Sequence, residues 1–169
     1  GDPQFIGDVS DTTQQVVGGK AKWDAGRMTL TLSGGSNLDN SVQSLDAEFM
    51  DFFESRRTSA SLQGDFRVAE GHVLTAGYDW QDDEGNVRDR FETQPTWQRW
   101  NRAVFAQYVG EFGAQDLQAS VRRDDNEQFG GNTTGGLAWG MSLAHDFRLT
   151  ASVGTAFKAP TFNELYFPF

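Results

Sequence analysis

The sequence predicts an all-β chain, an antiparallel segment of a transmembrane β-barrel with short turns at one rim and long loops at the other. Three observations predict this class. Apolar and polar residues alternate with a period of two in stretch after stretch of the 169 residues, while helical periodicity is weak. Tight turns alternate with long acidic segments along the chain. Aromatic residues gather near the predicted strand ends, where a membrane barrel meets the lipid headgroups.

The clearest predicted strand lies near the C-terminal end, where Leu149, Ala151 and Val153 alternate with Thr150 and Ser152. Successive strand side chains point to opposite faces, so we expect the first set to face lipid and the second to face the barrel interior. With the other stretches, the pattern predicts eight strands of about ten residues each. The alternation recurs clearly around 28–33, 59–66, 74–80, 117–122 and 136–143, and less well at 14–24 and 99–111.

Two kinds of connection join these strands. Four are predicted tight turns, at 24–27, 69–71, 113–116 and 145–146. The other three are the predicted long loops, which hold 14 acidic residues against two arginines in a chain whose net charge is −10. Such acidity repels nucleic-acid phosphates, so no nucleic-acid partner is expected, whereas cations would be attracted. The predicted loops are 36–54, 79–98 and 124–132.

Composition separates this prediction from a soluble β-sandwich, which also alternates. A sandwich core needs large aliphatic residues, whereas the apolar face here mixes alanine, glycine, leucine and aromatic residues. An aromatic content of 13% excludes a disordered chain, and the absence of cysteine excludes disulfides and thiolate metal sites. The polar face carries charged residues in mid-strand, as a water-filled lumen allows: Lys20, Lys22, Asp65, Arg67 and Arg122.

No residue pattern points to catalysis. His72 and His145 each stand alone at a predicted tight turn, with no nucleophile and no metal-ligand spacing nearby. The sequence therefore predicts a protein that is not an enzyme.

Two motifs in the last third resemble the TonB-dependent outer-membrane receptors. Residues 154–166 (GTAFKAPTFNELY) carry an element that many of these receptors share, siderophore transporters included. Residues 120–130 (SVRRDDNEQFG) are similar to the cobalamin (vitamin B12) transporters more specifically. The AGYDW motif at 76–80 and the WDAG motif at 23–26 fit the same transporters in order and approximate spacing. The resemblance covers nearly the whole chain and is strongest after residue 115.

This resemblance implies a barrel of about 22 strands plugged by an N-terminal domain. Residues 1–169 are then expected to be a partial barrel domain that lacks the plug, the remaining strands and the segment that engages TonB. The implied location is the outer membrane of a Gram-negative-type cell, and the implied partners are outer-membrane lipid and the TonB complex. The implied function is cobalamin uptake. A TonB-dependent siderophore receptor and a free-standing eight-stranded barrel are the alternatives.

The resemblance also carries over candidate site residues, and no covalent cofactor. Asp79, in the AGYDW motif, matches an aspartate that faces the ligand from the lumen, and its strand parity also predicts an inward position. Asn40 matches an asparagine in the loop after the second strand, and Phe169, or nearby Phe167, falls where an aromatic residue approaches the corrin. In these transporters calcium orders the substrate-binding loops. Asp11 is the best counterpart of one calcium ligand, with Asp8 as the alternative.

Overall fold

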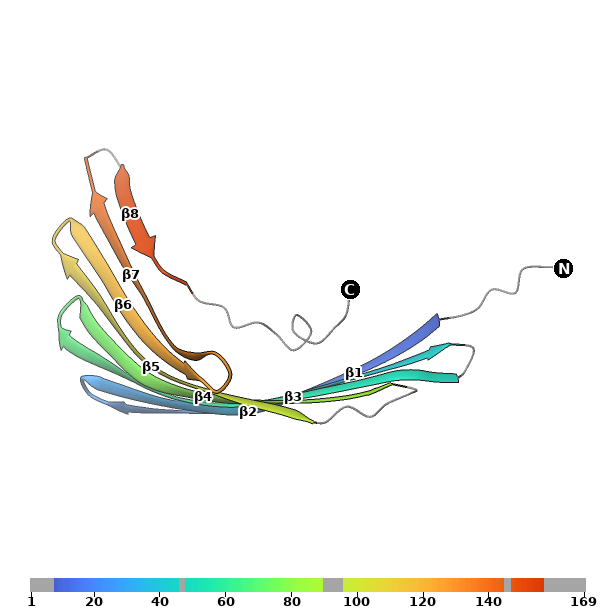
Figure 1. Ribbon diagram of the computed structural model, residues 1–169. Coiled ribbons are helices and arrows are strands. Elements are labelled where there is room, and N and C mark those ends of the chain that lie inside the picture. The colour runs from blue at the N-terminus through green and yellow to red at the C-terminus, as the bar shows by residue number, and fades with distance from the viewer. Residues whose placement is uncertain (1–7, 46–47, 90–95, 145–146, 157–169) are drawn as a thin grey trace.

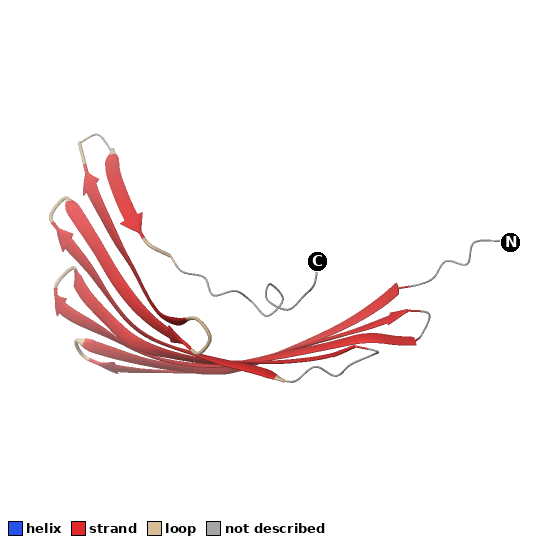
Figure 2. Cartoon of the chain, viewed as in Figure 1, coloured by secondary structure: helices blue, strands red, loops and turns tan. Residues whose placement is uncertain are grey.

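The computed structural model describes residues 8–45, 48–89, 96–144 and 147–156, which form one antiparallel sheet of eight strands (Figures 1 and 2). Each strand pairs with the next one in sequence, so the predicted number and order of strands are confirmed. The described residues include no helix that is long and apolar enough to span a membrane. The strands are β1 (Asp8–Ala25), β2 (Met28–Leu45), β3 (Glu48–Ala69), β4 (His72–Asp89), β5 (Trp97–Phe112), β6 (Gln115–Asn126), β7 (Gly130–Ser142) and β8 (Arg148–Gly154).

The sheet is curved but not closed. Figure 1 shows it bent into an open trough, with β1 and β8 as its two edges. An edge strand exposes unpaired N–H and C=O groups, which hydrocarbon cannot satisfy. The sheet is therefore a segment of a larger barrel, and other strands must flank both edges in a membrane.

The strands are longer than the sequence predicted. β1 to β4 contain 18, 18, 22 and 18 residues, whereas about 9–11 residues suffice to cross the hydrocarbon layer. Most of the three segments predicted as long loops is therefore strand, and only 127–129 separates β6 from β7. Water covers both faces of a strand beyond the membrane. Both faces are then polar, and the alternation that would have predicted a strand is lost.

Three of the four predicted tight turns lie within the described residues and close hairpins as expected, at 24–27, 69–71 and 113–116. Gly26 and Gly113 have φ angles of 66° and 65°, in the left-handed region that side-chain-bearing residues disfavour. The fourth predicted turn, at 145–146, lies outside the described residues.

The convex face of the sheet carries an exposed apolar band. Leu32, Leu62, Tyr78 and Val104 are successive cross-strand neighbours on this face, and their exposed fractions lie between 42% and 56%. The register continues the same face through Leu137 and Val153, with Val153 72% exposed. A band of this size would be an aggregation surface in water, but it suits contact with lipid. The predicted outward position of Val153 agrees with this register.

Aromatic residues mark both ends of the band. At the end away from the tight turns, Trp80 pairs across the ladder with Arg102, whose guanidinium lies 4.7 Å from the Trp100 ring centroid. At the turn end, His72 Nδ1 lies 2.6 Å from the hydroxyl of Tyr108. Such amphipathic rings suit the headgroup layer, so they indicate where the sheet enters and leaves the bilayer.

Candidate functional site

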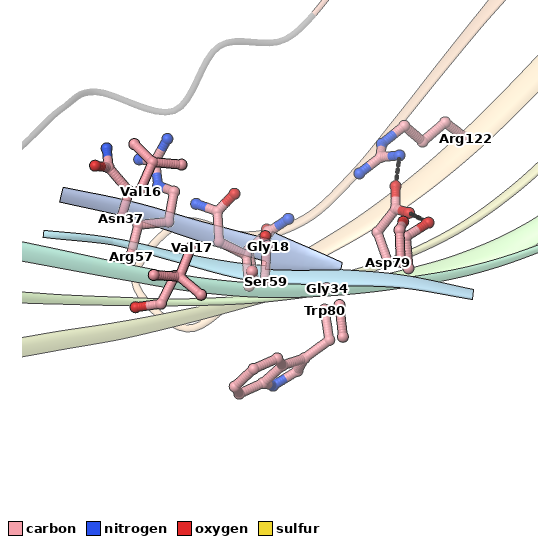
Figure 3. A pocket seen from close by; sticks show the side chains of 17 residues that line it. Val16, Val17, Gly18, Gly34, Asn37, Arg57, Ser59, Asp79, Trp80 and Arg122 are labelled. Atoms are coloured by element: carbon pink, nitrogen blue, oxygen red, sulfur yellow. Dashed lines mark hydrogen bonds and ion pairs between the residues drawn. The ribbon is translucent and has the colours of Figure 1, made fainter. Parts of the chain in front are cut away.

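Asp79 lies on the concave face, at the height where the convex apolar band ends. Its neighbours in β4, Tyr78 and Trp80, belong to the convex face, and Figure 3 shows Trp80 on the opposite side of the sheet from Asp79. The structure thus agrees with the inward position that strand parity predicted. The role of Asp79 in substrate binding stays a prediction.

The Asp79 carboxylate is held by two donors from neighbouring strands. The Ser61 hydroxyl donates to Oδ1 at 2.7 Å, and Arg122 Nη1 donates to Oδ2 at 2.5 Å. Arg122 Nε also donates to Asp124 at 2.9 Å. One guanidinium therefore serves two carboxylates, which leaves this cluster with a net charge of −1. The Asp79 side chain remains 31% exposed, so water and ligands reach it.

The AGYDW motif has a local structural reason. Gly77 and Phe105 are cross-strand partners on the concave face, and a Cβ atom at Gly77 would lie 2.4 Å from the Phe105 ring. Glycine is therefore the residue that leaves room for this ring. The Arg122 guanidinium in turn lies 5.9 Å from the Phe105 ring centroid. The glycine of the motif thus leaves room for the aromatic ring that lies beside Arg122, the arginine that contacts Asp79.

A second charged cluster lies on the concave face, further from the tight turns. Arg57 donates to both carboxylate oxygens of Asp83, at 2.7 Å and 3.2 Å. Arg99 reaches the same carboxylate at 3.6 Å. The side chains of Asp83 and Arg99 are each only 8% exposed, whereas Arg57 is 56% exposed. Two guanidiniums share one carboxylate, so this cluster has a net charge of +1.

A groove of about 490 Å³ separates the two clusters on the concave face. Its floor consists of small residues, with Gly18, Gly35 and Ser59 in one cross-strand row. Figure 3 shows Arg57 on one side of this floor and Asp79 on the other. A second hollow, of about 580 Å³, lies beyond Asp79, and its lining includes the polar residues Gln107, Ser120 and Thr134 of β5 to β7. Asp79 lines both cavities, so a ligand in either one can reach it.

Asn40 does not lie beside Asp79. Asn40 lies within β2 and not in a loop, between Thr13 and Glu54 of the adjacent strands, and its register places it on the convex face. Its side-chain oxygen is buried, and no donor reaches it among the described residues. Phe169 lies outside the described residues. The substrate-binding roles of Asn40 and Phe169 therefore stay predictions.

Asp11 lies in β1, and its role as a calcium ligand stays a prediction. It pairs with Val42 of β2, on the convex face, and within the described part of the chain no three His, Cys, Asp or Glu residues lie close enough to hold a metal ion. The alternative ligand, Asp8, begins β1. A calcium ion at Asp11 would need its remaining ligands from elsewhere in the protein.

No pattern in the sequence predicts the cluster of Arg57, Asp83 and Arg99. Asp83 lies in a segment predicted as a loop, and Arg99 lies in a stretch that fitted the alternation poorly. Arg57 lies between a predicted loop and a predicted strand, 26 residues before Asp83. Only the register of β3, β4 and β5 brings them together. Arg122 and Asp124 lie in the motif at 120–130 that the sequence singled out, but the contact of Arg122 with Asp79 also depends on register.

The chain is similar to one protein family and to two vitamin B12 transporters. The sequence profile described as "TonB dependent receptor-like, beta-barrel" matches residues 4–169. The chain is 28% identical over 153 residues to the vitamin B12 transporter BtuB of Photobacterium profundum, which covers 90% of this chain and 25% of that protein. It is 33% identical over 117 residues to BtuB of Vibrio vulnificus, a match that covers 68% of this chain and 19% of that protein. The chain thus spans about a quarter or less of these relatives.

Solved structures share the fold at low sequence identity. The siderophore receptor PirA from Pseudomonas aeruginosa superposes with a TM-score of 0.82 at 18% identity, over 92% of this chain and 28% of that one. The RagAB peptide importer in its closed-closed state superposes with a TM-score of 0.68 at 17% identity, over 88% of this chain and 23% of that one. These likenesses concern the barrel strands, and not what the proteins carry.

Proposed function

This chain belongs to the TonB-dependent receptor-like β-barrel family, and on that premise we propose that it is part of a transporter for cobalamin or related corrinoids. Members of this family are receptors and transporters of the outer membrane, and the outer membrane is the location of this chain. Uptake would be energised by the TonB complex, acting through a plug domain in the N-terminal region of the complete protein. In this proposal, residues 1–169 supply eight strands of a barrel of about 22.

The observation that carries this proposal is the similarity to vitamin B12 transporters along 90% of the chain. The concave face supports it. A corrinoid has an apolar ring face and many amide groups, which call for hydrogen-bonding side chains spread over a large site. The two hollows beside Asp79 are lined by hydroxyl, amide and charged groups of this kind.

The second candidate is a TonB-dependent siderophore receptor. The likeness to PirA favours it by fold alone, because the identity is 18%. Many ferric siderophore complexes are anionic and favour arginine-rich loops. The acidic segments 36–54, 79–98 and 124–132 hold only two arginines against 14 acids, which favours a neutral or cation-bridged ligand. A free-standing eight-stranded barrel is disfavoured, since β1 and β8 are the edges of an open sheet.

Binding to the purified complete protein distinguishes the two candidates. Titration with cobalamin and, separately, with ferric catecholate and hydroxamate siderophores gives the affinity for each class. The proposal predicts saturable binding of cobalamin at a 1:1 ratio, and no binding of the siderophores. Binding of a siderophore alone would replace the proposed substrate with the second candidate.

Asp79→Ala should weaken cobalamin binding by about 1–3 kcal/mol, because the variant loses an acceptor for a corrin amide. Asp82→Ala is the matched control, since Asp82 lies in the same strand on the convex face and accepts an exposed hydrogen bond from Gln98. The measurement is the cobalamin dissociation constant of each variant in the complete protein. Equal affinities for Asp79→Ala and the unmodified protein would remove Asp79 from the site.

Calcium is part of the proposal through Asp11, with its remaining ligands supplied by other parts of the protein. An ion that orders the substrate-binding loops beforehand removes an entropic cost from binding, so cobalamin affinity should rise with calcium. Asp11→Ala should then lower the affinity in calcium and leave it unchanged in chelator. A variant that behaves like the unmodified protein in both conditions would exclude Asp11 as a ligand.

A further inference from the structure

The groove beside Asp79 has opposite charges at its two ends. At one end, the guanidiniums of Arg57 and Arg99 share the carboxylate of Asp83, so these three side chains together carry a net charge of +1. At the other end, Asp79 and Asp124 share Arg122, for a net charge of −1. The groove therefore favours a ligand that carries an anionic group at one end and hydrogen-bond donors at the other.

Arg57 is the residue of the positive end that a ligand can reach. Its side chain is 56% exposed and lines the groove, while Asp83 and Arg99 behind it are each 8% exposed. Its Nε and Nη2 atoms donate to Asp83, which leaves both N–H groups of Nη1 for another acceptor. The buried carboxylate thus holds the guanidinium in place before a ligand arrives, which reduces the entropy lost on binding.

The surroundings of Arg57 suit a tetrahedral anion. Asn37, its cross-strand partner, is exposed beside it, and Ser59 follows two residues later on the same face. Both side chains can donate hydrogen bonds. Gly18 and Gly35 continue the row of Ser59, so no side chain blocks the approach of a bulky group to this floor. Arginine with neighbouring amide and hydroxyl donors is a favourable set for phosphate oxygens.

We propose that Arg57, with Asn37 and Ser59, binds a phosphodiester of the transported molecule. In cobalamin this group is the phosphodiester of the nucleotide arm, and the corrin amides would lie toward the carboxylates of Asp79 and Asp124. This assignment rests on the proposed function, because it takes a corrinoid as the ligand. It adds a specificity element, since corrinoids that lack the nucleotide arm cannot use the positive end of the groove.

The test compares two ligands and two neighbouring arginines in the complete protein. Cobalamin carries the phosphodiester, whereas cobinamide has the same corrin without the nucleotide arm. Arg57→Gln removes the proposed contact. Arg56→Gln removes the same charge one residue earlier, on the convex face, where Arg56 pairs with Leu38 and Glu84.

Arg57→Gln should weaken cobalamin binding about tenfold or more and leave cobinamide binding unchanged, while Arg56→Gln should change neither. The unchanged affinity for cobinamide also shows that the variant has folded. An equal loss for both ligands, or no loss for cobalamin, would overturn the assignment of the phosphodiester to Arg57. An unmodified protein that binds neither ligand would overturn the proposed function and this assignment with it.

Discussion

Replacing Asp83 with alanine is expected to destabilise the assembled barrel by about 3–5 kcal/mol, because the change removes the buried carboxylate that two guanidiniums share. Arg99 is 8% exposed and contacts Asp83 at 3.6 Å, and Arg57 loses both of its hydrogen bonds. The change also removes the negative charge that both arginines contact. The effect should therefore exceed that of removing an ordinary surface ion pair.

Asp82→Ala provides the control for this prediction, since it removes a carboxylate from the adjacent position on the opposite face. Its exposed hydrogen bond to Gln98 should be worth no more than about 0.5 kcal/mol. Urea unfolding of the complete barrel in lipid vesicles measures both variants. If Asp82→Ala and Asp83→Ala lost the same stability, the buried cluster would have no special role.

Val153→Arg is expected to cost about 2–4 kcal/mol of stability in the bilayer, because Val153 lies on the lipid-facing band. Its ladder partner Leu137 is also exposed on the convex face. A guanidinium there must either enter hydrocarbon or draw water into the bilayer. The measurement is the free energy of unfolding of Val153→Arg from lipid vesicles.

Ser152→Arg is the matched substitution on the other face. Ser152 pairs with Ala138 on the concave side of the sheet, where the lumen holds water. Little loss of stability is therefore expected from this variant. The assignment of the two faces would be reversed if Ser152→Arg were the more damaging change.

The fold was predictable where the two faces of a strand meet different surroundings. Around Leu149 and Leu62, lipid on one side and water on the other impose the period-two pattern, and the strands were found correctly. From position 36 to position 41 only Leu38 is apolar, so the sequence carries little such contrast. Backbone pairing continues there regardless, because a strand needs only a partner ladder and not an apolar face.

The candidate site was predictable only in part. The orientation of Asp79 follows from parity within β4, which is a local property of the sequence. Its contact with Arg122 spans 43 residues, and it depends on the register of three strands, which the alternation does not specify. The position of Asn40 was also not predictable from the sequence. A position that matches a loop residue by spacing lies within β2 here, where strand parity places its side chain on the convex face.

The most direct test of the proposed function is uptake of radiolabelled cobalamin by cells in which the complete protein is the only corrinoid receptor, with and without a functional TonB complex. We predict saturable uptake that requires TonB and that falls at low cobalamin concentration in the Asp79→Ala variant. Cells that hold the protein in the outer membrane and take up a ferric siderophore, but no cobalamin, would contradict it.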